Sequence, residues 1–188
     1  SAPPARVRLQ RDGSVQSAVR LGRPGIPASS PDYVPAQLAN TVLGGGFSSR
    51  LMQNLREDKG YTYGAGSALG TFRAGGRISA SADVRNEVTG AAIQEFRSEL
   101  ARIGTEPVSA RELEDTKRYV AGGYLLSNQM QGSVASALAS NWLVGLSQPS
   151  AAKASWRTTA SALTIGRRWY FAMAPMIPAP SAAPATKK

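Results

Sequence analysis

Residues 43–67 read LGGGFSSRLMQNLREDKGYTYGAGS, and this stretch fixes the order of the elements around it. Its three consecutive glycines, Gly44–Gly46, indicate the end of one helix and a bend before the next, since glycine readily adopts the conformations that close helices. Apolar spacing then predicts a second helix from Ser48 to Lys59 that ends at Gly60. We expect its buried side to carry four residues: Phe47, Leu51, Met52 and Leu55.

Periodicity outside this stretch predicts strands and helices in a mixed order. Two-residue alternation predicts strands over 5–11, 15–22, 61–70 and 75–84, the first two separated by the turn signal Asp12-Gly13. A helix opens at Pro31 and Asp32 and runs to the glycines, and helical spacing recurs over 86–103, 109–126, 131–144 and 151–171. This order predicts the α+β class, with helices packed on one face of a mainly antiparallel sheet.

The length of 188 residues suits one domain, which we place at residues 5–172. Residues 1–4, Ser-Ala-Pro-Pro, are typical of a linker or a cloning remnant, and we expect a longer polypeptide around the chain. Residues 173–188 are rich in proline and alanine, so a poorly ordered tail is expected there.

Histidine and cysteine are both absent from the chain. Catalysis by Ser-His or Cys-His pairs is therefore excluded. Catalytic zinc sites nearly always include histidine, so no zinc site is expected here. A site for magnesium or calcium built from carboxylates alone stays open.

The net charge of +10 raises the question of an acidic partner such as nucleic acid or an anionic membrane. The basic residues occur singly, however, and aromatic residues do not interleave with them as in proteins that bind single strands. We therefore expect no nucleic-acid partner. No apolar run reaches the roughly 18 residues of a membrane span. The Ala/Arg/Gly-rich composition favours a bacterial protein, and we expect it in the periplasm or cell envelope rather than the cytoplasm.

Two other patterns are weaker signals of chemistry. Gly64–Gly70 has the wrong spacing for a dinucleotide-binding loop and opens no helix. The carboxylates Glu57 and Asp58, and the group from Glu112 to Asp115, are expected on solvated helix faces. Ser109 and Glu112 have the spacing of a helix N-terminal capping box.

The positions that agree with a known family lie densely in the opening stretch: Leu43-Gly44-Gly45, Phe47, Ser49-Arg50-Leu51, Asn54-Leu55-Arg56, Lys59-Gly60 and Tyr63-Gly64. Here the chain resembles the pitrilysin or insulinase family of zinc metallopeptidases, in its C-terminal-type domain. Weaker agreement extends over about residues 5–147. Two departures accompany it. The HxxEH zinc signature is impossible without histidine, and after Leu146 the family's closing strand is expected to be lost or shortened.

The resemblance implies roles for five residues of this sequence. Tyr63 would donate its phenolic O–H to the oxyanion that forms during peptide hydrolysis, and Arg56 would hold the substrate backbone. Gly44, Gly45 and Gly46 would bend the chain and give an extended peptide substrate close access to the backbone. No metal ligand or cofactor is implied for this chain itself. Zinc would be carried by an HxxEH domain of the same protein or of a partner subunit.

Alternatives from the residues themselves also remain. Arg56 could serve only as a basic residue near a helix C-terminus, and Tyr63 only as a packed strand aromatic. Tyr61 is a competing tyrosine, but Tyr63 matches the seven-residue offset of the family. At the level of the chain, the alternatives are a non-catalytic scaffold relative of the same family and a basic nucleic-acid-binding domain.

Overall fold

The computed structural model describes residues 5–146, and its central element is strand β3, Gly76–Arg85. Strand β3 pairs antiparallel with β1, Gln16–Gly25, on one side and with β2, Thr62–Thr71, on the other. The predicted strands over 15–22, 61–70 and 75–84 are therefore confirmed. Buried and more exposed residues alternate along β3, so one face of this strand packs on the core and the other face points away from it.

The predicted strand over residues 5–11 is wrong. This segment is irregular, and only the turn at Asp12-Gly13 is present, with Gly13 at a φ of 75°. Its apolar residues Val7 and Leu9 are exposed, as is Val15 after the turn. Apolar alternation alone does not make a strand when neither face finds a partner to bury against.

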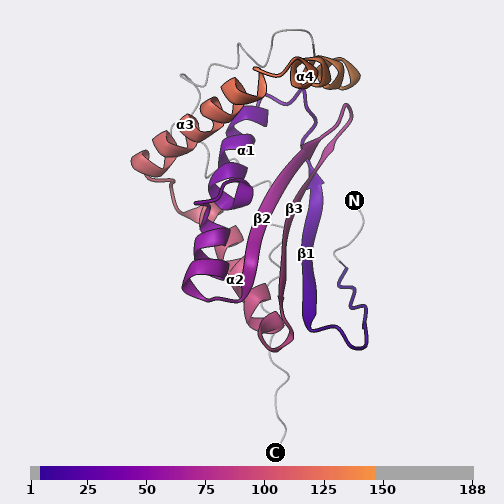
Figure 1. Ribbon diagram of the computed structural model, residues 1–188, viewed down its shortest axis with the longest axis vertical. Helices are drawn as coiled ribbons and strands as arrows, with labels where there is room; N and C mark the ends of the chain where they lie inside the picture. The colour runs from indigo at the N-terminus through magenta and orange to yellow at the C-terminus, as the bar shows by residue number, and fades with distance from the viewer. Residues whose placement is uncertain (1–4, 147–188) are drawn as a thin grey trace, which may run out of the picture.

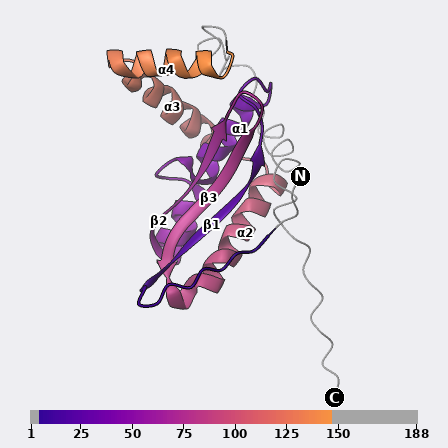
Figure 2. The ribbon, with the colours of Figure 1, turned by 90° about the vertical axis from the view of Figure 1, so that its right-hand side faces the viewer.

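The helices that contact the sheet lie against one of its faces, as predicted (Figure 1). In Figure 2 the sheet is seen from its other side, with α1 and α2 behind the strands. The helical elements are α1 Tyr33–Asn40, η1 Thr41–Gly45, η2 Met52–Asp58, η3 Asn86–Val88, α2 Thr89–Thr105, α3 Ala110–Ser127 and α4 Gln131–Leu143.

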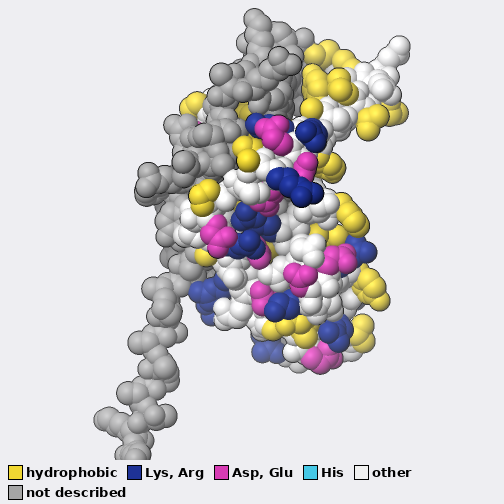
Figure 3. Space-filling model, turned by 90° about the vertical axis from the view of Figure 1, so that its left-hand side faces the viewer, with side chains coloured by type: hydrophobic (Ala, Val, Ile, Leu, Met, Phe, Trp, Pro, Cys, Tyr) yellow, Lys and Arg dark blue, Asp and Glu magenta, His cyan; other side chains and the backbone are white. Residues whose placement is uncertain are grey.

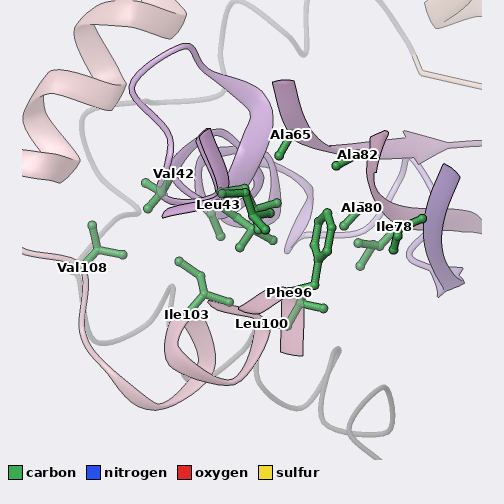
Figure 4. Packing of buried hydrophobic residues seen from close by; sticks show 14 of the residues in the cluster. Val42, Leu43, Ala65, Ile78, Ala80, Ala82, Phe96, Leu100, Ile103 and Val108 are labelled. Atoms are coloured by element: carbon green, nitrogen blue, oxygen red, sulfur yellow. The ribbon is translucent and has the colours of Figure 1, made fainter. Parts of the chain in front are cut away.

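The core lies between α2, the sheet and the glycine-flanking helices (Figure 4). Phe96 points from α2 toward Ala80 and Ile78 of β3, and all three side chains are buried. Leu51 and Leu55 of the second predicted helix are fully buried in the same cluster. Burying a large apolar side chain stabilises a fold by roughly 1.5–3 kcal/mol, so this cluster anchors the element that carries Arg56.

Helices α3 and α4 contribute less to the core. Leu113 and Thr116 are the buried residues of α3, whereas Tyr124, predicted to be buried, is largely exposed. In α4, Leu138 and Trp142 are also exposed, and the yellow side chains gathered at the upper right of Figure 3 lie over this helix. Basic and acidic side chains are interspersed on the face that Figure 3 shows.

Several predictions fall on residues 1–4 and 147–188, which lie outside the described part of the chain. They are the N-terminal linker, the helix over 151–171, the shortened closing strand and the tail over 173–188. Within residues 5–146, no helix combines the length and the hydropathy needed to span a membrane.

Candidate functional site

The glycine stretch joins two helices that are wider than the sequence pattern predicts. Both η1, Thr41–Gly45, and η2, Met52–Asp58, are π-helices, in which a backbone bond spans five residues instead of four. In η2 the Lys59 N–H donates to the carbonyl of Asn54 at 3.0 Å. Such segments are rare and are frequent at functional sites. The predicted helices exist, but their hydrogen-bond pattern departs from the α-helix on both sides of Gly46.

Gly44 lies directly against strand β2. A methyl group at this position would collide with the backbone nitrogen of Ser67 and would lie 2.8 Å from the Ser67 Oγ and the Gly66 carbonyl carbon. On the other side of the contact, the Ser67 hydroxyl donates to the Asn40 carbonyl at 3.2 Å, and the Asn40 side chain donates back to the Ser67 carbonyl. Gly44 therefore packs η1 onto the strand, and this packing sets where the loop begins.

We expect Gly44→Ala to destabilise the protein by about 1–3 kcal/mol, because the added methyl overpacks a contact made of backbone atoms. Gly46→Ala is the matched control. Gly46 has extended backbone, with φ −123° and ψ 162°, and the nearest atom to an added methyl is 3.7 Å away. Urea unfolding of both variants measures the difference. Equal stability of the two variants would contradict the packing role of Gly44.

Arg56 is held near the end of η2 by several contacts. Its guanidinium carbon lies 5.4 Å from the centre of the Phe47 ring, and its Nε lies 3.3 Å from a Glu57 carboxylate oxygen. The side chain keeps 38% of its exposure. The Gly60 N–H donates to the Arg56 carbonyl at 3.1 Å, which closes the helix. Arg56 is thus a basic residue in a last helical turn, and its charged end is also presented to solvent.

Helix η2 is itself fastened to α2. The Asn54 side-chain amide donates to Glu95 at 3.0 Å and to the buried Glu99 at 2.8 Å. The Lys59 ammonium lies 3.7 Å from the Glu95 carboxylate. Asn54 precedes Arg56 in the sequence and Lys59 follows it, so the segment that carries Arg56 is bound to α2 on both sides of this residue.

Tyr63 stands out from the strand, with 90% of its surface exposed. The cause is an irregularity in the pairing of β2 with β3. Thr62 pairs with Val84 and Ala65 with Ala82, so three steps on β2 match two steps on β3. One extra residue on a strand re-aims the neighbouring side chains. The hydroxyl of Thr62 stabilises the distortion by donating to the Asp83 carbonyl at 2.7 Å and accepting from the Gly64 N–H at 3.1 Å.

The bulge separates the two tyrosines that simple alternation places together. Tyr61 is half-buried against the core, and its carbonyl accepts from the Arg85 N–H at 3.3 Å. Tyr63 has no such packing, so the reading of Tyr63 as a packed strand aromatic does not hold. The Tyr61 N–H donates to the Leu55 carbonyl at 2.9 Å, and this bond closes the turn between the helix that carries Arg56 and the strand that carries Tyr63.

Sequence reasoning placed Phe47 on the wrong side and missed one ion pair. Phe47, predicted to face the core, is 71% exposed beside Arg56.

Arg50 donates twice to Glu112 of α3, at 2.9 Å for both bonds. The hydrogen bond from Arg50 is the main cause that lowers the pKa of the Glu112 carboxyl from its ordinary value. The predicted cap at Ser109 is present, with its Oγ accepting from the Glu112 N–H.

Nothing among residues 5–146 fits a zinc ion. No group of three or more His, Cys, Asp or Glu side chains there is arranged to hold a metal.

The family of this chain is decided by its sequence over residues 2–120, which match the sequence profile described as the peptidase M16 inactive domain.

The chain belongs to the peptidase M16 inactive-domain family. It is 27% identical over 118 residues to a Bacillus subtilis protein named uncharacterized zinc protease YmxG, covering 63% of this chain and 29% of that protein. The chain therefore spans less than a third of this relative's length. The resemblance to the pitrilysin family is confirmed.

Solved structures agree with the M16 fold. A crystal structure of the peptidase M16 inactive domain from Pseudomonas fluorescens superposes with a TM-score of 0.74 at 26% identity, covering 82% of this chain and 37% of that one. The inactive peptidase domain of a putative zinc protease from Bordetella parapertussis gives 0.62 at 21% identity, covering 90% and 88%. The α+β architecture predicted for this M16 domain is confirmed.

Proposed function

We propose that this M16 inactive domain is the zinc-less half of a two-part peptidase, and that it supplies Arg56 and Tyr63 to a peptide held between the halves. The observation that carries the proposal is the position of Tyr63. The ring is 90% exposed beside an irregularity in the pairing of β2 with β3, on the strand that follows the turn after the helix of Arg56. An exposed phenol and guanidinium close in the sequence favour this function over that of a non-catalytic scaffold.

The two side chains suit two different tasks on one substrate. Peptide hydrolysis develops negative charge on the former carbonyl oxygen, and a neutral phenolic O–H is a donor suited to that oxygen. The guanidinium of Arg56 stays charged at every relevant pH and makes directional bonds to carbonyl oxygens. Tyr63 thus acts mainly on the transition state, whereas Arg56 acts mainly on the bound peptide.

The zinc domain completes the site from outside this chain. Relatives are named zinc proteases, and the matched region covers 28–29% of their length. An HxxEH domain in the same polypeptide or in a partner subunit supplies the metal and its hydrolytic chemistry. The substrate class is an extended peptide.

Complementation tests this division of labour. The 188-residue chain alone is expected to bind no stoichiometric zinc in equilibrium dialysis and to leave an unstructured fluorogenic peptide intact. Cleavage is expected once the zinc-carrying domain of its own gene, or of a partner subunit, is added. Zinc-dependent cleavage by the chain alone would overturn the proposal, and so would full activity of the zinc domain without the chain.

A further inference from the structure

The exposed ring of Phe47 has no packing task that explains it. The residue follows Gly46 in the loop between η1 and η2, and 71% of its surface is exposed. It does not belong to the buried cluster that contains Leu51 and Leu55. A large apolar side chain at this exposure gains little from burial, so its contact with Arg56 is the interaction that distinguishes it.

The geometry of that contact is an attraction between a cation and an aromatic ring. The guanidinium carbon of Arg56 lies 5.4 Å from the ring centre, inside the distance of about 6 Å at which such pairs attract. Glu57 contacts the same guanidinium at Nε, at 3.3 Å. Within residues 5–146 the terminal Nη1 and Nη2 atoms of Arg56 donate no hydrogen bond. The two contacts therefore restrain the Arg56 side chain and leave its Nη1 and Nη2 atoms available to donate hydrogen bonds to a substrate.

The loop that carries the ring is itself fixed. Gly44 packs against the backbone of Ser67, the Ser49 N–H donates to the Gly46 carbonyl at 3.2 Å, and the Gln53 N–H donates to the Ser49 carbonyl at 2.9 Å. Phe47 lies between these anchored points. The backbone that carries the ring is therefore held in place, while Arg56 has a long side chain whose rotamer freedom is lost on binding.

We propose that Phe47 is a positioning residue for Arg56, holding the guanidinium in the orientation that receives a substrate carbonyl. This inference rests on the proposed function, and it adds to it a role for Phe47. A restrained side chain loses less entropy when it binds, so the expected gain is in substrate affinity. An exposed pair of this kind changes affinity by about two- to fivefold.

The test compares Phe47→Leu with Phe47→Trp in the full-length protein that contains the zinc domain. Leucine keeps apolar volume but has no aromatic face, whereas tryptophan has the most attractive face for a cation. We expect Phe47→Leu to raise KM for an extended peptide about two- to fivefold with kcat unchanged, and Phe47→Trp to restore the original KM. Both variants are expected to stay folded in thermal unfolding, because the ring is exposed and lies outside the core.

A double-mutant comparison separates this inference from the proposed function. In an Arg56→Ala background, Phe47→Leu is expected to raise KM no further, because the ring acts through the guanidinium. An equal rise in both backgrounds overturns the positioning role, as does a KM that is the same in the leucine and tryptophan variants. If Arg56→Ala itself leaves KM unchanged, the proposed function of Arg56 fails, whatever Phe47 does.

Discussion

Replacing Tyr63 by phenylalanine is expected to lower kcat of the assembled peptidase by about 100- to 1000-fold. The change removes one O–H and nothing else, and the loss of a single oxyanion donor costs about that factor. KM is expected to change little, because the donor acts on charge that exists only in the transition state. Steady-state kinetics on an extended peptide measures both constants. The folded state is expected to be unaffected, since the ring is 90% exposed.

Tyr61→Phe is the matched control for this prediction. Tyr61 lies two residues earlier in the same chain segment, but its ring is half-buried against the core. Its hydroxyl is therefore not offered to a substrate as that of Tyr63 is, and kcat of this variant is expected to equal that of the natural sequence. A kcat unchanged by Tyr63→Phe removes Tyr63 from the mechanism, and equal losses in both variants indicate a structural effect.

The parts of the fold that could be predicted are those with one buried face. Strand β3 buries Ile78, Ala80, Ala82 and Val84, and the residues that alternate with them are more exposed. Helix α2 buries Phe96 at helical spacing. Each pattern is the direct consequence of one side meeting the core. The segment over 5–11 has similar apolar residues, but it pairs with no strand in the described part of the chain, so the apolar pattern alone gave a wrong prediction.

The geometry around the candidate residues could not be predicted from the sequence. Alternation puts Tyr61 and Tyr63 on one face, and the extra residue in β2 that separates them depends on pairing with β3. Periodicity likewise does not encode the π-helical hydrogen bonds of η1 and η2 or the packing of Gly44 against Ser67. Phe47 was assigned to the core because its spacing fits, yet it precedes the helix and faces Arg56.

Replacing Arg50 by methionine is expected to destabilise the folded protein by about 2–3 kcal/mol at neutral pH. Arg50 and Glu112 are 62 residues apart, and the pair joins the start of the η2 helix to α3 through two bonds of 2.9 Å. The arginine side chain is only 9% exposed and the glutamate 32%. Removing one partner leaves the other partly buried and unpaired, which costs several times more than the loss of a surface pair.

Urea unfolding compares this variant with Arg111→Met on α3. The Arg111 side chain is 93% exposed and lies 3.9 Å from Asp115, so solvent already screens that pair. Little change in the free energy of unfolding is expected for Arg111→Met. Equal effects of the two substitutions would contradict a special role of the Arg50–Glu112 pair in holding η2 to α3.

The pH dependence of the same measurement identifies the interaction. Arg50 lowers the pKa of Glu112 below its ordinary value of 4.5, so the folded state binds that proton more weakly than the unfolded state. The stabilisation is therefore complete above this value and is lost as the pH falls through the lowered pKa. The gap between the natural sequence and Arg50→Met is expected to be constant from about pH 6 to 8 and to shrink below the ordinary pKa of glutamate. A gap that is as large below the ordinary pKa of glutamate as it is at neutral pH would show that packing of the arginine stem, not its charge, joins the two helices.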